Sequence, residues 1–389
     1  MVRKMDFVDE CYADKDLSLL EKITLVIPTY NRNFYLSRCL WYHAHFPFGE
    51  IIVADSSPEN KKVVNRSTVE KIRSIFNANI RYLEYEPETE KYGGDIYRKW
   101  GDAVLQVRTE YSHIVTDKEF INPSVQNTCI KYMEHNPFIQ YADSAHINVS
   151  YDETRCEFVY MLSKSFVSTE ALSILRLDEM AHNPGFTLLS LHRSKMHKHI
   201  FSKLTSSGIN DIRYGEKYLE LADCIQGRAY FLEDNIMTVR DIISFYGKND
   251  SVRKKESSCY RYFYNDCYGR KDFNEEQIDK CVISLHKMCC DVDGCDYNLL
   301  DVEKLIRYYL KKKGAYSAKS LILNRFGCIK SLFYVTPIKY RGFLKKIFLR
   351  NDNTSANLKK TDCLYHQIQN SVIHRILESF KEDEDEPII

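Results

Sequence analysis

The sequence lacks long apolar runs and has no excess of charge of either sign. No stretch of about 18 apolar residues occurs, so no membrane-spanning helix is expected. The formal net charge is +1, which predicts no general attraction to nucleic acid. The N-terminal stretch MVRKMDFVDECYADKDL is charged and has no apolar centre, so no secretory signal peptide is expected. These absences favour a cytoplasmic protein without a nucleic-acid partner.

Paired cysteine spacing is also missing. The 13 cysteines are scattered, and a reducing cytoplasm would keep most of them as free thiols. The densest group, CCDVDGC at Cys289 to Cys295, has no C-x-x-C pair of the kind that binds zinc. A calcium loop would need a Glu where Val302 stands. Buried or loop thiols are therefore the preferred interpretation of this group, and a metal site is the weaker alternative.

Apolar residues are abundant enough for a large folded core. They make up 44% of the 389 residues, a length that favours two domains over one. Tyrosine, with 28 residues, is also abundant. Its apolar ring and polar tip suit contacts with sugars, proteins or membrane interfaces, and composition alone does not choose among these.

Strand patterns alternate with helical patterns through the first 250 residues. The runs ITLVIP (23–28) and EIIVAD (50–55) lack polar alternation, which is typical of strands buried on both faces of a parallel sheet. The pattern predicts an α/β fold with a mostly parallel sheet flanked by helices, followed by a mainly helical C-terminal region. Further strands are predicted at 80–85, 111–117, 139–151 and after Gly227, and helices within 29–46, 69–76, 93–107, 125–137 and 214–226.

Polar loops follow the first, second and fourth predicted strands: PTYNR, ADSSPEN and TDKEF. In such sheets ligands bind beyond the carboxyl ends of the strands, where these loops meet. Asp117 and Glu119 could both turn toward one ion, and their hard oxygen atoms suit Mg²⁺ or Mn²⁺. Lys118 stands between them, so an ordinary strand-to-loop exit is the alternative. In an extended segment Lys118 would point away from both acids, whereas a sharp turn would let its ammonium meet an anion.

The order of these motifs resembles the family 2 type of glycosyltransferase with the GT-A fold. The resemblance rests on LVIPTYNRNFYLSRCL, IIVADSS and the acidic strand end, which is similar to a DDDF motif. NPGFTLLSLHR (183–193) and YGE (214–216) are similar to two further motifs, a P-x-F…HR run and FGE. The resemblance covers about residues 22 to 245. It implies a sugar transferase that uses a nucleotide-sugar donor.

The resemblance also implies roles for individual residues. Asp55 would accept hydrogen bonds from the nucleotide base, although it could equally cap a helix. Asp117 and Glu119 would hold Mn²⁺ or Mg²⁺, although the departure from DDDF leaves open that the ion is dispensable. Donor binding would further involve Pro28, Thr29, Tyr30, Asn31, Arg32, Lys99, Asp117, His192 and Arg193. For Lys99 the alternative is a solvated helix residue, and for His192 with Arg193 an exposed pair.

Glu216 is the candidate general base, because an inverting transfer needs a carboxylate to take the proton of the acceptor hydroxyl. A surface acid in a first helical turn is its alternative role. The implied acceptor is a growing polysaccharide or glycolipid. A non-catalytic scaffold that kept the fold is the competing function. A nucleotidyltransferase is disfavoured, because PTYNR contains no glycine.

We predict an N-terminal extension (1–21), a GT-A glycosyltransferase domain (22–250), a mainly helical domain (251–380) and an acidic tail (381–389). Residues 304–350 hold 13 Lys and Arg and no Asp or Glu. Within them KYRGFLKKIFLR (339–350) places apolar residues beside cations, which suits a peripheral site on an anionic membrane face. A solvated helical face is the alternative interpretation.

Overall fold

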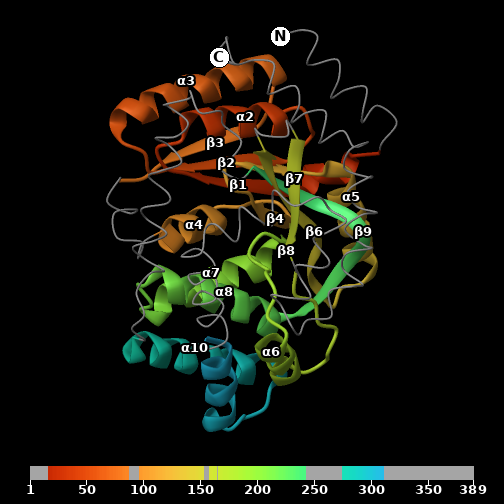
Figure 1. Cartoon of the computed structure of the whole chain (residues 1–389), viewed down its shortest axis with the longest axis vertical. Helices are drawn as coiled ribbons and strands as arrows, with labels where there is room; N and C mark the ends of the chain where they lie inside the picture. Colours follow the sequence, from red (N-terminus) through yellow and green to blue (C-terminus); the bar gives the residue numbers. More distant parts are fainter. Residues whose placement is uncertain (1–15, 87–95, 153–156, 164, 242–273, 311–389) are drawn as a thin grey trace.

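One mixed sheet forms the centre of the molecule (Figure 1). The computed structural model describes residues 16–86, 96–152, 157–163, 165–241 and 274–310. Within them the sheet has nine strands in the order β3-β2-β1-β4-β8-β6-β9-β5, with β7 paired to β6. The strands are β1 (Ile23–Thr29), β2 (Glu50–Asp55), β3 (Ile80–Glu84), β4 (Tyr111–Ile114), β5 (Glu119–Ile121), β6 (Ile139–Asp152), β7 (Glu157–Ser163), β8 (Leu191–Arg193) and β9 (Arg228–Asp241).

Parallel pairing is concentrated in the N-terminal half of the sheet. β1 pairs parallel with β2 and β4, and β2 pairs parallel with β3. The later strands β8, β7 and β5 join antiparallel, and among the strands that the structure describes β6 and β9 form a further parallel pair. The predicted α/β fold class is therefore confirmed, with the parallel part of the sheet formed by the strands that the sequence patterns identified.

Helices cover both faces of the parallel half (Figure 1). Leu25 and Ile27 of β1 belong to the core shared with α2, whereas Val26 belongs to the core shared with α4. Because both faces are buried, apolar residues are needed on both, which explains why Leu25, Val26 and Ile27 follow one another without polar alternation. The helices are η1 (Ser18–Lys22), α2 (Asn33–His43), α3 (Glu59–Phe76), α4 (Ile96–Leu105), α5 (Pro123–His135), α6 (Ser173–His182), α7 (Ser194–Ser207), α8 (Ile212–Gln226) and α10 (Glu275–Asp293).

The sequence patterns missed several elements between β4 and α8. β5 and β8 have three residues each, too few for any periodicity to register. No helix is predicted where α7 lies, because its polar residues obscure the buried stripe that faces α4 and α8. The helix predicted within 125–137 is shifted by two residues: Asn122 Oδ1 accepts hydrogen bonds from Ser124 N (3.2 Å) and Val125 N (3.5 Å), so α5 begins at Pro123 and ends at His135.

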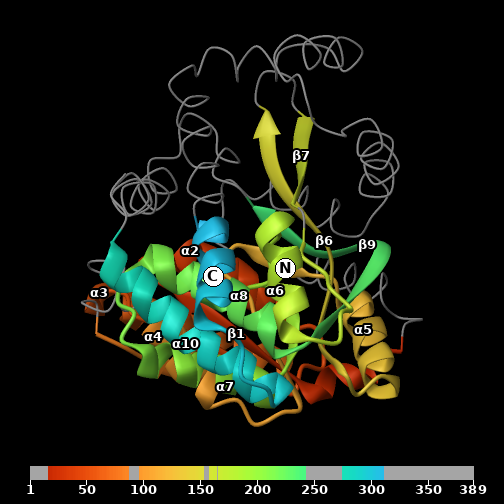
Figure 2. The ribbon, with the colours of Figure 1, turned by 90° about the horizontal axis from the view of Figure 1, so that it is seen from below.

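α10 and a helical segment at 299–310 complete the described chain. In Figure 2 they lie over α8 and α6. Ile278, Leu285 and Tyr309 are buried in the same apolar core as α8. Residues 274–310 therefore pack onto the α/β part through a shared core. The predicted domain boundary near 250, the membrane segment 339–350 and the acidic tail lie outside the described residues.

Two further predictions concern the surface. No helix in the described ranges is long and apolar enough to cross a membrane. Of the basic stretch 304–350, the structure describes only residues 304–310. There Lys304 pairs with Asp301 (3.1 Å), and Arg307 pairs with Glu275, Asp279 and Glu303. These two cations are balanced by nearby acids, as expected of a solvated helical face.

Candidate functional site

The loop after β1 crosses over the end of β2. Asn31 has a left-handed backbone, with a φ of 55°, a conformation that Asn tolerates better than most residues. Its backbone N–H donates to Ser57 Oγ at 2.8 Å. This contact fixes the PTYNR loop to the loop that follows β2. An unusual backbone conformation held by a neighbouring loop is more common at functional sites than elsewhere.

Lys99 of α4 joins the ends of the same two strands. Its ammonium donates to the carbonyl of Thr29 at 3.2 Å and to Ser56 Oγ at 2.7 Å. The side chain is only 2% exposed. The alternative role as a solvated helix residue is therefore wrong, and a buried positive charge lies at the carboxyl ends of β1 and β2.

Asp55 at the end of β2 is fully buried and accepts several hydrogen bonds. Its carboxylate accepts from Ser57 N and Asn65 Nδ2, both at 2.7 Å, and from Tyr82 OH at 2.5 Å. Burial and this hydrogen bond raise the pKa of Tyr82 well above its usual range. α3 begins after Pro58, and no side chain caps it, so Asp55 does not serve as its N-cap. Asp55 holds together the loop, α3 and β3 at this end of the sheet.

The acidic strand end turns sharply. Glu119 N donates to Thr116 O at 3.0 Å, which closes a turn around Asp117 and Lys118. Of the two arrangements considered for Lys118, the structure has the sharp turn. Glu119 is then the first residue of β5, opposite Arg240 of β9.

The two acids face different arginines. Asp117 binds Arg32 Nη1 at 3.0 Å and accepts from Thr29 Oγ1 at 2.8 Å. Glu119 forms an ion pair with Arg240 and accepts from Thr116 N at 2.7 Å. Both carboxylates are buried, so neither is a solvated loop acid.

This donor set can be compared with the needs of a divalent ion. Each of the four carboxylate oxygens of Asp117 and Glu119 accepts from a protein donor. A metal ion would have to displace guanidinium groups from these oxygens, which attract both kinds of cation. The residues in the arrangement described therefore do not fit a bound Mn²⁺ or Mg²⁺.

Glu216 lies on α8, one residue after a close contact with α4. A Cβ on Gly215 would come within 2.7 Å of the Tyr97 ring, so only glycine permits this approach of the two helices. Tyr97 is two residues before Lys99, which places Glu216 near the helix that contributes Lys99. Glu216 forms an ion pair with Lys217 at 2.6 Å and its side chain is 19% exposed. Burial would lower the pKa of Lys217, but Glu216 and Glu220 raise it above its usual value.

His192 and Arg193 are not brought to this end of the sheet. Arg193 pairs with Tyr111, the first residue of β4, and donates to the carbonyls of Ile139 (2.9 Å) and Met133 (2.6 Å). It therefore fastens α5 and β6 at the amino end of β4. His192 is fully buried and bonds Asp223 through Nε2 at 3.1 Å. The two residues therefore do not form an exposed pair. Their predicted contact with a diphosphate stays untested.

Buried histidines pack against both faces of the sheet. Burial lowers the pKa of His43 to about 4, and it lowers the pKa of His113 and His197 well below the usual range. His197 bonds Ser112 Oγ at 2.8 Å and stacks on His192, with ring centroids 4.2 Å apart. The lowered pKa values make His43, His113 and His197 neutral members of the core.

Two residues that contribute to the polar contacts at the carboxyl ends of β1, β2 and β4 were not predicted from the sequence. Ser56, which bonds Lys99, is part of the ADSS motif and could have been included. Arg240 had no signal, because its partner Glu119 is 121 residues away and reaches it only through the antiparallel pairing of β5 with β9.

Comparisons with known proteins give structural likeness only. No protein-family model matches the chain, and no curated protein matches it. Among solved structures, S. aureus TarS is 14% identical with a TM-score of 0.40, over 74% of this chain and 54% of TarS. The chain thus spans about half the length of that protein. TarS 1–349 in complex with UDP-GlcNAc is 14% identical with a TM-score of 0.40, over 76% of this chain and 92% of that fragment. Mannosyl-3-phosphoglycerate synthase from Rubrobacter xylanophilus is 11% identical with a TM-score of 0.33, over 66% of this chain and 79% of that one.

Proposed function

We propose that the protein is a glycosyltransferase that uses a nucleotide-sugar donor. The observation that supports this most is the meeting of Arg32, Lys99, Asp55 and Asp117 around the end of β1. All four contact residues of the PTYNR and ADSS loops or the carboxylate that faces them. Two cations at the carboxyl ends of parallel strands suit a ligand with an anionic diphosphate, and Asp55 would accept from the base by exchanging one of its present hydrogen bonds.

The reaction places the greatest electrostatic demand on the leaving group. The acceptor hydroxyl oxygen forms a bond to the anomeric carbon, and the bond from that carbon to the diphosphate oxygen breaks. The leaving nucleoside diphosphate gains negative charge, which fixed cations stabilise. Arg32 and Lys99 are the cations that we assign to this role. Arg32 is 11% exposed, so a ligand phosphate can reach it from solvent.

The proton of the acceptor hydroxyl passes to Glu216 in this proposal. A carboxylate opposite the leaving group is required for a single displacement, which inverts the anomeric configuration. The partial exposure of Glu216 and its proximity to α4 support this assignment. The acceptor is a hydroxyl of a growing polysaccharide or glycolipid. A peripheral position on an anionic membrane face remains a separate prediction about residues 304–350.

Ligand binding tests the proposal directly. Nucleotide sugars are screened by thermal shift, with UDP-GlcNAc and UDP as the first probes. A bound ligand raises the unfolding temperature by mass action, about 2.7 kcal/mol of added stability at 100 times the Kd. A shift with at least one nucleotide sugar, abolished in Lys99→Met, supports the assignment. If no nucleotide sugar changes the unfolding temperature, the scaffold alternative is preferred.

The predicted metal requirement is tested separately by repeating turnover in EDTA. The ion pairs of Asp117 and Glu119 favour turnover that persists without a divalent ion. Loss of turnover in EDTA that Mn²⁺ restores would mean that the arginines move aside and that both acids bind the ion. Either result leaves the nucleotide-sugar assignment intact, because the thermal shift reports on it independently.

A further inference from the structure

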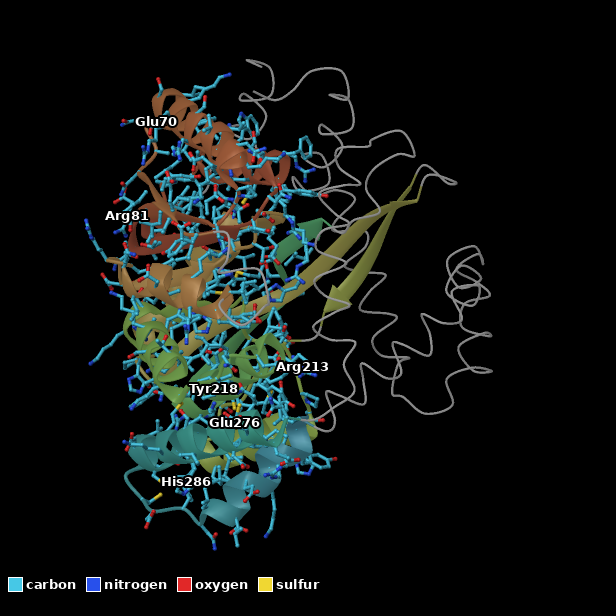
Figure 3. The ribbon with its side chains drawn as sticks, turned by 90° about the vertical axis from the view of Figure 1, so that its left-hand side faces the viewer. Glu70, Arg81, Arg213, Tyr218, Glu276 and His286 are labelled. Atoms are coloured by element: carbon cyan, nitrogen blue, oxygen red, sulfur yellow. The ribbon has the colours of Figure 1, made fainter. Side chains whose placement is uncertain are left out.

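The last turns of α10 bring three potential metal ligands together. Figure 3 labels His286 near the lower end of the molecule, far from Glu70 on α3 at the upper end. His286 and Cys290 are four residues apart on α10 and therefore lie on the same face of the helix. Asp296 comes from the loop after the helix. Among the described residues, this is the group of three or more His, Cys, Asp or Glu residues whose ligand atoms all lie within 4.8 Å of one another.

The distances suit a small tetrahedral site. Cys290 Sγ lies 3.6 Å from His286 Nε2 and 4.0 Å from an oxygen of Asp296. Zinc binds sulfur at about 2.3 Å and nitrogen or oxygen at about 2.0–2.1 Å. A tetrahedral angle then places sulfur about 3.5 Å from the other ligand atoms. The two distances to sulfur need to contract by at most about 0.5 Å to reach this geometry.

The loop that contributes Asp296 is held over the helix by its neighbour, Tyr297. The backbone N–H of Tyr297 donates to Cys290 Sγ at 3.5 Å, and its carbonyl is 2.8 Å from His286 Nε2. The Tyr297 hydroxyl donates to Asp293 at 2.6 Å. Gly294, with a φ of +65°, allows the chain to leave the helix in this direction. The backbone at Asp296 is thus positioned by contacts of the residues on both sides of it.

We propose that His286, Cys290 and Asp296 bind a zinc ion. Sulfur, imidazole and carboxylate form a ligand set that a borderline-soft ion such as Zn²⁺ accepts. On binding, Cys290 loses its thiol proton to solvent, and the Nε2 proton of His286, which is donated to the Tyr297 carbonyl, moves through solvent to Nδ1 so that Nε2 can bind the ion. Asp296 is exposed and the other two are half-buried, so an ion reaches the group from solvent and water fills the fourth position.

The ion would fasten α10 to the helical segment at 299–310. Only one of the three cysteines in the CCDVDGC run takes part, because Cys289 is buried in the core and Cys295 lies outside the group. A site of this kind therefore cannot be recognised from C-x-x-C spacing. The ligands are a His-x3-Cys pair on a helix and an acid from the next loop, a pattern without a paired-cysteine signature. This inference does not rest on the proposed glycosyltransferase function.

Cobalt absorption of the full chain tests the proposal. Co²⁺ replaces Zn²⁺ in tetrahedral sites, and a cobalt–thiolate bond gives a charge-transfer band that can be titrated. One equivalent of Co²⁺ should give this band, and Zn²⁺ should remove it by displacement. Cys290→Ser should abolish the band, whereas the matched control Cys295→Ser should keep it. His286→Gln and Asp296→Asn should weaken Co²⁺ binding at least tenfold.

A second measurement protects the test against misfolded variants. The unfolding temperature of metal-free Cys290→Ser should equal that of the metal-free parent chain, because Cys290 is half-buried at the end of its helix. Zn²⁺ should raise the unfolding temperature of the parent and of Cys295→Ser but not that of Cys290→Ser. An unchanged cobalt band in Cys290→Ser, or no band in the parent chain, would overturn the proposal.

Discussion

Two arginine–carboxylate pairs lie at opposite ends of the parallel strands, one after β1 and β4 and the other at the start of β2 and β3. At the carboxyl ends Arg32 binds Asp117 at 3.0 Å, and at the amino ends Arg81 binds Glu50 at 3.0 Å. The carboxylate is buried in each pair, and the arginine is 11% exposed in the first and 24% exposed in the second. By distance and burial the pairs are nearly equivalent.

Their surroundings differ. Arg81 also donates to the carbonyl of Gln106 at 2.9 Å and to its Oε1 at 3.4 Å, and because Gln106 follows α4, Arg81 ties a helix end to the sheet. Asp117 instead shares Thr29 with the buried ammonium of Lys99. A buried ion pair is therefore not by itself a sign of a ligand site. Its position among loops at the carboxyl ends of parallel strands gives it that meaning.

The largest effect is expected from a change to the proposed general base, Glu216. Glu216→Gln removes the proposed base and should lower kcat roughly 10²- to 10⁴-fold, the usual contribution of general base catalysis. The KM for the donor should change little, because the amide keeps the shape of the side chain. Steady-state kinetics with a nucleotide sugar provides the measurement. A kcat that stays at the level of the parent chain would remove Glu216 from the mechanism.

Lys99→Met should have the next largest effect. It replaces the ammonium by an apolar side chain of similar length, so β1 and β2 lose their shared cation. We expect turnover to fall roughly 10²- to 10³-fold, as when one preorganised group of this kind is removed. Calorimetry with a nucleoside diphosphate should show weaker binding as well. Binding equal to that of the parent chain would place the diphosphate elsewhere.

Arg32→Ala and Arg81→Ala make the comparison itself testable. Each change leaves a buried carboxylate without its guanidinium, so both should lower the free energy of unfolding by about 3 kcal/mol. Urea denaturation measures this loss. Only Arg32→Ala should also weaken nucleotide-sugar binding, by about tenfold or more. If both variants bind the donor equally well, the carboxyl end has no special role for its arginine.

The last prediction concerns pH and the buried histidines. Guanidinium groups stay protonated throughout the accessible range, so losses below pH 7 have another source. The pKa of His43 is lowered to about 4, and those of His113 and His197 are lowered as well. The unfolded chain therefore binds protons more readily. Stability is complete above about pH 6.5 and falls by up to about 1.4 kcal/mol per pH unit for each histidine toward pH 4.

Urea midpoints measured between pH 7 and pH 5 check this prediction. His43→Asn is an informative variant, since its side chain can still bond the Cys39 carbonyl but does not titrate. The slope of stability against pH should be shallower in this variant than in the parent chain. Equal slopes would mean that His43 does not contribute to the pH dependence.

The parallel half of the fold could be predicted from the sequence because its signals are local. A strand buried on both faces shows a continuous apolar run, and β1 is buried at all seven positions. The antiparallel half depends on pairings between distant segments, such as β5 with β9. Three-residue strands leave no periodic pattern, and their register is set by contacts that a single sequence does not show.

At the carboxyl ends of β1, β2 and β4, the sequence predicts which loops lie together but not which side chains pair. PTYNR, ADSS and the acids after β4 were identified as neighbours, and the structure joins them through Thr29, Ser56 and Lys99. The partners of the acids could not be foreseen. Arg32 is 85 residues from Asp117, and Arg240 is 121 residues from Glu119. These ion pairs could not be predicted, because partners so far apart in the sequence leave no local pattern.

The cysteines differ in burial, so the reactivity of each thiol reports whether the helix or strand that carries it has opened to solvent. Among the seven cysteines of the described ranges, five are buried, Cys290 is half-buried and Cys295 is exposed. Burial raises the pKa of Cys129, Cys224 and Cys281, so few of these thiols ionise near neutral pH. An alkylating reagent should modify Cys295 within the folded chain and the buried thiols only after their elements separate. Mass spectrometry of timed alkylation would then map, helix by helix, which parts of this core open first.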